Sequence, residues 1–403
     1  MRILMFTPYV PYPPNSGGQT RTFNLIKNLS RKHEITSFSF LRTDQKEPDL
    51  AELRKYCQKV EIFRRHKSFS SAGKIIKTGF SLYPYLVNMY LDRKVQEGIA
   101  RELNQTHYDL IHVETYYIMP NLPATPVPVL LAEQTIEYLV YQHYAETSPW
   151  WHFYPLWSLK PLLYIDSVKH KYWEQYYWRK AKKVAAMSEA DQKKMTDLVP
   201  GLNVGIVPNG VDTLFFSQRL YRPDAKARTF LFVGNFNWLQ NREAVAILVK
   251  EIWPRIKKQM ADARLWIVGR SPTPEIKKFA SLDIRVSEDI EDIRSAYQTS
   301  QVLLAPLFGG GGTRYKILES MASRLPVVAT QIGIEGIGAI NKVHALISND
   351  PDELAAMAVE VIRNRKLAGR ISREAYELVA RDFDWEVISS RLDNIYAETA
   401  RRN

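Results

Sequence analysis

The sequence lacks the residues on which disulfide-stabilised, zinc-binding and membrane-spanning proteins depend. Its 403 residues include one cysteine, Cys57, so no disulfide can form within the chain, and a reducing compartment is favoured. The eight histidines include no pair at zinc-ligand spacing and no His-Glu-x-x-His pattern. Two Asp-x-Asp sequences, at residues 350–352 and 382–384, fit helix N-caps better than metal sites. We therefore expect no essential metal.

Long apolar runs and a secretory leader are also missing. No stretch reaches the roughly 18 to 20 apolar residues that a spanning helix needs. Residues 1–8 carry one positive charge, and Pro8, Pro11 and Pro13 interrupt the region, which is unlike a signal peptide. We therefore expect a cytoplasmic location, with peripheral contact at the inner face of the cell membrane.

Negative charge is scarce relative to positive charge. Lysine and arginine number 55 against 43 aspartates and glutamates, which gives a net charge of +12. Such a balance favours an anionic partner, and nucleic acid, an acidic membrane or a phosphorylated substrate would each satisfy it. Because no DNA- or RNA-binding motif is present, we expect no nucleic-acid partner.

Short apolar runs alternate with amphipathic stretches along the chain, which is typical of parallel strands joined by helices. The alternation restarts after a helical, basic segment at residues 172–194, so two doubly wound α/β domains fit better than one barrel. We predict an N-terminal domain at residues 1–200, a C-terminal domain at residues 201–381, and a final helix over residues 382–403 that packs back toward the first domain. The second series of strands is expected to begin at residues 204–207.

Gly17 and Gly18 lie between the first predicted strand and a helix that begins near Thr20. In a doubly wound domain this turn lies where glycines allow the backbone to approach a ligand and a helix N-terminus favours anions. Taken alone, the pair is equally well explained as an ordinary loop.

A second glycine-rich turn, at residues 309–312, indicates an anion site more strongly. Arg314 and Lys316 lie in the first turns of the helix that follows, where cations oppose the helix dipole. They are better explained as partners of an anion that backbone N–H groups hold. The Gly-Lys-Ser/Thr of a P-loop is absent.

Five short motifs are spread along the chain. They are Gly17-Gly18, residues 206–212 (Ile-Val-Pro-Asn-Gly-Val-Asp) after Met187-Ser188-Glu189, Phe232-Val233-Gly234, residues 266–269 (Trp-Ile-Val-Gly), and residues 316–330, which contain Glu319. Together they resemble the GT-B glycosyltransferases of family four, over most of the chain and most strongly at residues 184–336. That family has two Rossmann-like domains facing a central cleft and transfers a sugar from a nucleotide donor with retention of configuration.

The resemblance implies roles for particular residues. Glu319 would bind the nucleotide ribose, since a carboxylate can face two vicinal hydroxyls. No cofactor is implied beyond the nucleoside-diphosphate sugar itself, which is a co-substrate. The donor site would comprise Gly17, Gly18, Gly234, Asn235, Gly310, Gly311, Gly312, Thr313, Arg314, Lys316 and Glu319, with catalytic roles for Arg314, Lys316 and Glu319.

The chain departs from the family pattern on the donor side. Gly311 stands where the family usually has a glutamate, so a carboxylate for sugar hydroxyls is absent there. The Arg/Lys pair that follows Phe-Val-Gly in many members is not in its usual register. Arg314 and Lys316 could replace it by stabilising the negative charge of the leaving diphosphate, and Arg242 is a weaker candidate.

The loop after residues 129–132 is the expected acceptor site. Many family members have a histidine here, whereas this chain has Glu133 and Gln134. Gln134 can orient a sugar hydroxyl but cannot act as a base. Glu133 and Glu137 are further candidates, although Glu137 is explained slightly better as an acid favoured in the first turn of a helix.

Residues 150–178 contain eleven aromatic side chains. Two interpretations stay open. Half of these rings could pack beneath the sheet with the lysines solvated, or the stretch from Trp150 to Lys183 could dock on an anionic membrane or hold a lipid-linked acceptor there. The accompanying cations are Lys160, Lys169, Lys171, Arg179, Lys180, Lys182 and Lys183.

The resemblance implies a retaining, metal-independent transferase that acts on a carbohydrate or lipid-linked acceptor in polysaccharide or glycoconjugate synthesis. The leaving diphosphate would help to deprotonate the acceptor hydroxyl. Two alternatives stay open. A nucleotide-sugar epimerase or hydrolase of the same fold would convert the donor without an acceptor, and a non-catalytic basic binding protein on a degenerate transferase scaffold would not bind nucleoside diphosphates.

Overall fold

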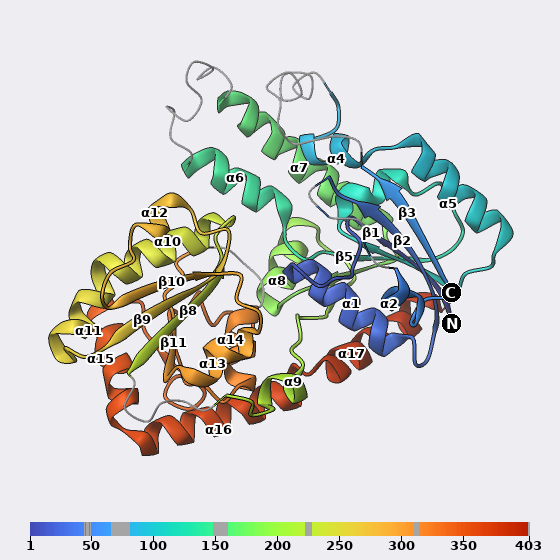
Figure 1. The fold of residues 1–403 in the computed structure, drawn as a ribbon. Coiled ribbons are helices and arrows are strands. Elements are labelled where there is room, and N and C mark those ends of the chain that lie inside the picture. The colour runs from blue at the N-terminus through green and yellow to red at the C-terminus, as the bar shows by residue number, and fades with distance from the viewer. Residues whose placement is uncertain are drawn as a thin grey trace. The chain divides into compact units, whose positions relative to one another are not determined.

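The structure is a computed structural model (Figure 1). It describes residues 1–43, 45, 48, 50–65, 81–147, 160–221, 228–309 and 314–401. The chain divides into two compact units, one formed by Met1–Val207 together with Ser389–Asn403 and the other by Pro208–Ile388. Each unit contains its own parallel sheet, which confirms the predicted α/β class with two doubly wound sheets.

The first unit is built on a seven-stranded sheet in the order β3-β2-β1-β4-β5-β6-β7. Its inner strands are almost continuously buried, because they are apolar runs of the kind that sheets covered on both faces require. The chain order reverses between β1 and β4, and ligands of such sheets bind beyond the carboxyl ends of the strands at this point. The strands are β1 (Arg2–Thr7), β2 (Glu34–Leu41), β3 (Lys59–Arg64), β4 (Leu110–Glu114), β5 (Val129–Ala132), β6 (Lys183–Ala186) and β7 (Val204–Ile206).

Three helices of the first unit begin at a side chain that accepts a hydrogen bond from the first turn. Ser16, Asp92 and Ser188 cap α1, α5 and α8 in this way, as short polar residues commonly do. Among the described residues, no helix is both long and apolar enough to cross a bilayer. The helices are α1 (Gly17–Leu29), α2 (Ala51–Arg54), α4 (Tyr85–Tyr90), α5 (Arg93–Gln105), the 3-10 helix η1 (Tyr116–Asn121), α6 (Glu137–Thr147), α7 (Lys160–Lys180) and α8 (Glu189–Leu198).

The boundary between the units lies later than the sequence indicated. Residues 204–207 were expected to open the second domain, but Val204 pairs with Val184, so β7 extends the first sheet. The first unit therefore continues to Val207 instead of ending at residue 200. A three-residue edge strand has no pattern of its own that shows which sheet it joins.

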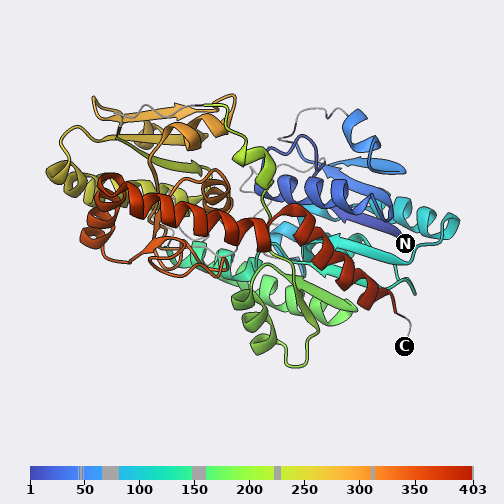
Figure 2. The ribbon, with the colours of Figure 1, turned by 90° about the horizontal axis from the view of Figure 1, so that it is seen from below.

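The last helix, α17 (Trp385–Ala400), enters the first unit from Ser389 onward (Figure 2). Asp393 Oδ1 lies 2.8 Å from His33 Nε2, and Tyr396 Oη lies 2.5 Å from His112 Nδ1. Glu398 pairs with Lys183. The C-terminal segment thus completes the packing of the first sheet.

The second unit has a six-stranded sheet in the order β10-β9-β8-β11-β12-β13, with its reversal between β8 and β11. Its strands are β8 (Thr229–Asn235), β9 (Arg264–Arg270), β10 (Ile284–Glu288), β11 (Val302–Ala305), β12 (Val327–Ala329) and β13 (Leu346–Ile347). Its helices are α9 (Thr213–Ser217), α10 (Leu239–Ile247), the π-helix η4 (Leu248–Ile252), α11 (Trp253–Gln259), α12 (Pro274–Lys277), α13 (Ile293–Thr299), α14 (Tyr315–Ala322), α15 (Pro351–Arg363) and α16 (Arg365–Asp382).

Both Asp-x-Asp sequences supply helix caps, as predicted. The side chain of Asp350 accepts hydrogen bonds from the backbone of Asp352 and Glu353, with Pro351 in the first turn of α15. Asp384 Oδ1 accepts from the backbone N–H of Glu386 at 2.9 Å, and this bond caps α17. Their carboxylates are thus explained by helix geometry.

Candidate active site

The turn at the carboxyl end of β8 forms one wall of the candidate donor site. Asn235 Oδ1 accepts from the backbone N–H of Asn237 at 3.0 Å. Asn241, which is buried at the start of α10, donates from Nδ2 to the carbonyl oxygen of Asn235 at 2.8 Å. A Cβ on Gly234 would lie only 3.1 Å from Asn241 Cγ, so glycine allows this close packing.

Helix α14 brings Lys316 to the same turn. Lys316 Nζ donates to Asn241 Oδ1 at 2.7 Å and lies 4.5 Å from the centroid of the Phe232 ring. Burial, helped by the positive charge of Arg314 and opposed by Glu319, lowers the pKa of Lys316 to about 7. An anion placed beside this ammonium would favour its charged form.

Arg314 occupies the N-cap position of α14, where no side chain among the described residues caps the helix. Its guanidinium donates to the carbonyl oxygen of Gly309 at 3.2 Å. The helix begins at Tyr315. Four predicted donor residues, Gly310, Gly311, Gly312 and Thr313, lie outside the described residues.

Glu319 lies one turn after Lys316 on α14, so the two side chains share a face of the helix. Tyr297 Oη donates to Glu319 Oε2 at 2.7 Å. Burial raises the pKa of Glu319, while Tyr297 and Lys316 oppose the shift. The structure therefore brings Lys316 and Glu319 together and orients the Glu319 carboxylate through Tyr297.

Sequence reasoning identified neither Asn241 nor Tyr297 as a site residue. Asn241 lies in the segment where many family members have an Arg/Lys pair, and a neutral amide there carries no signal of phosphate binding. Tyr297 lies on α13, 22 residues before Glu319, and no local pattern indicated their contact. Arg242, the weaker candidate, is exposed on α10.

Gly17 and Gly18 begin α1 at the carboxyl end of β1. A Cβ on Gly18 would lie 2.6 Å from Tyr9 Oη and 2.7 Å from Gln134 Oε1, and real Cβ atoms do not approach so closely. Gly18 therefore packs directly against Gln134, a residue predicted for the acceptor site.

The orientation of Gln134 is set by its partners. Its Nε2 donates to Glu114 Oε2 at 2.7 Å and to Tyr9 Oη at 2.5 Å. Burial alone would raise the pKa of Glu114, but His112, Arg21 and Gln134 together lower it below its usual value. Because an ionised carboxylate only accepts, the amide NH₂ must face Glu114 and the amide oxygen faces Gly18.

Glu133 was also predicted to contact an acceptor, but the structure encloses it. Its side chain is 1% exposed. Oε1 accepts from Trp178 Nε1 at 3.0 Å, and Oε2 accepts from the backbone N–H of Tyr116 at 3.4 Å. Burial raises the pKa of Glu133 well above its usual value, and Glu174 adds to the shift. Glu133 thus anchors α7 and does not present a carboxylate to a ligand.

Glu137 begins α6, as its alternative interpretation expected. Its backbone N–H donates to Glu174 Oε1 at 2.7 Å, and that of Tyr138 donates to Oε2 at 3.1 Å. Glu174 on α7 therefore caps α6. Burial raises the pKa of Glu137 to about 7.

The aromatic and basic stretch divides into buried and exposed side chains. Trp178 and Tyr177 are buried in the core, whereas Tyr172 is 63% exposed. Lys183 pairs with Glu398 and is only 11% exposed, so it does not present its charge freely to lipid. The ring-rich part at residues 150–157 lies outside the described residues.

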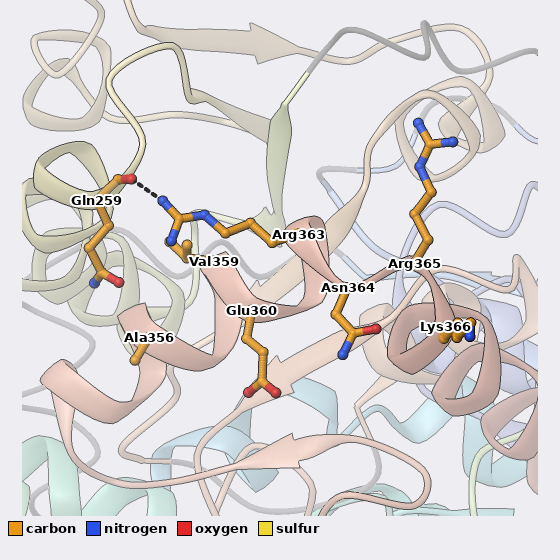
Figure 3. Close-up of a pocket in the computed structure, with 8 residues that line it drawn as sticks. All are labelled: Gln259, Ala356, Val359, Glu360, Arg363, Asn364, Arg365 and Lys366. Carbon is orange, nitrogen blue, oxygen red and sulfur yellow. Dashed lines mark hydrogen bonds between the residues drawn. The ribbon is translucent and has the colours of Figure 1, made fainter.

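A surface pocket of about 570 Å³ lies in the second unit, where the end of α11 meets α15 and α16 (Figure 3). Arg363 closes one side by donating to the carbonyl oxygen of Gln259. The pocket contains none of the predicted donor or acceptor residues. Within the described ranges, no group of three or more His, Cys, Asp or Glu side chains is arranged to hold a metal ion.

Two family models match the chain and together span both sites. The model described as Glycosyltransferase Family 4 matches residues 15–214, and the model described as Glycosyl transferases group 1 matches residues 227–364. The chain belongs to the GT-B glycosyltransferases of family four. The segment matched by the first model includes Gly18 and Gln134, and the segment matched by the second includes Asn241, Lys316 and Glu319.

Solved structures of GT-B enzymes share the fold of this family-four chain. Sucrose-phosphate synthase from Thermosynechococcus elongatus superposes with a TM-score of 0.74 and 16% identity, over 99% of each chain. Anabaena HepE, solved in complex with UDP and glucose, gives a TM-score of 0.64 and 16% identity, over 99% of this chain and 100% of that chain. At such identities the likeness shows the fold alone.

A curated relative of this family-four chain is the phosphatidyl-myo-inositol mannosyltransferase of Mycobacterium tuberculosis. It is 27% identical over 206 residues, which are 48% of this chain and 54% of the relative. The chain thus matches about half the length of that relative.

Proposed function

We propose that the protein is a retaining glycosyltransferase that transfers a sugar from a nucleoside-diphosphate sugar to a carbohydrate or lipid-linked acceptor. The observation that carries the proposal is the meeting of Lys316, Asn241 and Glu319 beyond the carboxyl end of β8. This is the edge at which doubly wound sheets bind nucleotides. Membership of family four supports the reaction class.

The donor chemistry of the proposal follows from the charges at this edge. Breaking the bond between the sugar and the diphosphate leaves negative charge on the phosphate oxygen. Lys316 and Arg314 would stabilise that charge without a metal ion, and Glu319 would hold the ribose hydroxyls. The released phosphate oxygen would take the proton of the attacking hydroxyl, since Gln134 cannot act as a base.

Gln134 supplies the acceptor contact in this proposal. Its amide oxygen faces Gly18 because Glu114 fixes the amide NH₂, so it can accept a hydrogen bond from a hydroxyl. The related mannosyltransferase acts, by its name, on phosphatidyl-myo-inositol. That relationship favours a lipid-linked acceptor and a role in glycoconjugate or polysaccharide synthesis.

The membrane contact belongs to the same proposal. Six exposed apolar or aromatic side chains on α6 and α7 form what we call the α6–α7 face: Val140, Tyr144, Tyr164, Ile165, Val168 and Tyr172. Exposed Lys171 precedes Tyr172 on α7, exposed Arg179 and Lys180 lie at the end of the helix, and Lys182 lies just beyond it. Apolar and basic side chains together suit an interface with anionic lipids. The net charge of +12 would add to the attraction between the protein and such lipids.

The proposal is tested by incubating the purified protein with a panel of nucleoside-diphosphate sugars, UDP-glucose among them, with and without candidate acceptors. Release of nucleoside diphosphate that depends on the acceptor and persists with a metal chelator is expected, and NMR of the product should show the anomeric configuration of the donor. Conversion of the donor without an acceptor would favour an epimerase or hydrolase. Absence of nucleoside-diphosphate binding would favour the non-catalytic alternative.

A further inference from the structure

Asn241 joins two parts of the candidate donor site. Its Nδ2 donates to the carbonyl oxygen of Asn235 on the β8 turn at 2.8 Å, and its Oδ1 accepts from Lys316 Nζ on α14 at 2.7 Å. Asn241 is buried, with 8% of its surface exposed.

The two hydrogen bonds fix which way the amide points. The carbonyl oxygen of Asn235 can only accept, and an ammonium can only donate. Asn241 must therefore direct Nδ2 to Asn235 and Oδ1 to Lys316. A tight contact with Gly234, whose added Cβ would lie 3.1 Å from Asn241 Cγ, holds the side chain in place.

The choice of a neutral partner matters for the charge of Lys316. An aspartate here would form a buried ion pair with the ammonium and would compete with an incoming anion. Asparagine accepts the same hydrogen bond without adding a negative charge beside the ammonium. The charged groups acting on Lys316 from α14 are Arg314 and Glu319, and the β8 strand contributes the neutral ring of Phe232.

We propose that Asn241 is a positioning residue for the donor diphosphate: it holds the Lys316 ammonium against the β8 turn through a neutral acceptor, so that the charge is available to phosphate. This inference rests on the proposed function, because it assigns the diphosphate to Lys316. Binding of the diphosphate then requires a proton on Lys316. The affinity for the diphosphate should therefore fall as Lys316 loses its proton in the free protein.

The test measures the affinity for UDP, or for whichever nucleoside diphosphate of the panel binds tightest, between pH 6 and pH 9. In the wild-type protein, affinity should fall above pH 7, because burial lowers the pKa of Lys316 to about 7. One titrating group gives a fall of about tenfold for each pH unit.

Two variants shift this profile in opposite directions. Asn241→Asp should weaken binding at pH 7 and move the inflection to higher pH, because a carboxylate stabilises the charged ammonium. Asn241→Leu removes the acceptor and should move the inflection below pH 7. Thermal denaturation shows whether each variant is folded. If one variant fails to fold, the other still tests the inference. Lys250→Ala is the matched control, since it changes the net charge by the same amount as Asn241→Asp at an exposed residue of η4 in the same unit.

The outcomes separate the inference from the function beneath it. If folded Asn241 variants bind more weakly but keep the inflection near pH 7, Asn241 only supports the turn and the inference is wrong. If the wild-type protein binds no nucleoside diphosphate at any pH, the proposed function itself fails. A shift produced equally by Lys250→Ala would show a general charge effect and would also overturn the inference.

Discussion

Lys316 and Arg314 are cations in a place where helix electrostatics disfavour them, which makes them the residues most directly open to test. Arg314→Ala and Lys316→Ala should each weaken nucleoside-diphosphate binding by about 1.5 to 3 kcal/mol, as expected for charge-assisted bonds. Binding of the nucleoside alone should change little. Titration calorimetry with both ligands measures the difference.

Lys250→Ala serves as the control for these two variants, since Lys250 is an exposed cation of the same unit that lies outside the candidate site. Equal losses for the nucleoside and the nucleoside diphosphate would reject the phosphate role of Arg314 and Lys316.

Glu319 offers a second test at the scale of single atoms. If its carboxylate accepts from two ribose hydroxyls, Glu319→Gln should weaken donor binding by about 1 to 3 kcal/mol. A 2′-deoxy donor should then lose little further affinity, because interacting partners are not additive. A double-mutant cycle of protein and ligand measures this coupling.

Tyr297→Phe is the companion variant, because it removes the hydroxyl that holds Glu319 Oε2. We expect it to reduce the coupling between Glu319 and the 2′-hydroxyl. Full additivity of Glu319→Gln and the 2′-deoxy change would mean that the two groups do not meet.

At the scale of elements, the start of α1 is packed too closely for any side chain at Gly18. Gly18→Ala would force Tyr9 and Gln134 apart, since the new Cβ would lie within 2.7 Å of both side chains. We expect destabilisation of about 1 to 3 kcal/mol and a fall in transfer activity larger than the fall in donor binding. Denaturant titration and steady-state kinetics measure these quantities.

Gly369→Ala is the matched control, because a Cβ there meets nothing within 4 Å and the residue lies inside α16. Alanine should stabilise that helix by up to about 1 kcal/mol. If Gly18→Ala behaved like Gly369→Ala, the close approach of α1 to Gln134 would not matter for activity.

The α6–α7 face gives a prediction about membranes. Vesicles with anionic lipids should bind the protein, and binding should weaken as salt rises, because each cation near the surface contributes roughly 1 kcal/mol that salt screens. Arg179→Glu/Lys180→Glu/Lys182→Glu and, separately, Val168→Asp/Tyr172→Asp should each reduce co-sedimentation.

Neutral vesicles and an exposed charge reversal outside this region, such as Lys258→Glu on α11, are the controls. Equal pelleting on neutral and anionic vesicles, or variants that bind like the wild-type protein, would show that the α6–α7 face does not bind membranes.

At the scale of the whole molecule, the C-terminal segment links residues far apart in the sequence. Tyr396 is fully buried and bonded to His112, which in turn lies 3.3 Å from Glu114. Tyr396→Phe leaves a buried nitrogen of His112 without this partner, so we expect a loss of about 1 to 3 kcal/mol in stability. Urea denaturation followed by tryptophan fluorescence measures it.

The variant Tyr172→Phe removes a hydroxyl from an exposed ring and is the control for Tyr396→Phe. Unchanged stability in Tyr396→Phe would show that the His112–Tyr396 hydrogen bond contributes nothing measurable to the first unit.

The sequence alone determined the fold class and the order of elements. Parallel strands buried on both faces must be apolar along their length, so the runs at β1, β4, β8 and β11 are visible without coordinates. That Lys316 and Glu319 share a face also follows from local helix geometry, because residues three apart lie on one helical face. Their roles at a donor site stay predictions.

Only the tertiary structure showed which side chains from distant parts of the sequence contact one another. Asn241 and Tyr297 come to Lys316 and Glu319 from other helices, and Glu174 caps α6 from α7 across 37 residues. Burial of Glu133 depends on where Trp178 packs, and β7 joins the first sheet through an edge pairing of three residues. Side-chain partners brought together by folding leave no spacing pattern in the chain, because their separation in sequence is set by topology and not by the period of a helix or strand.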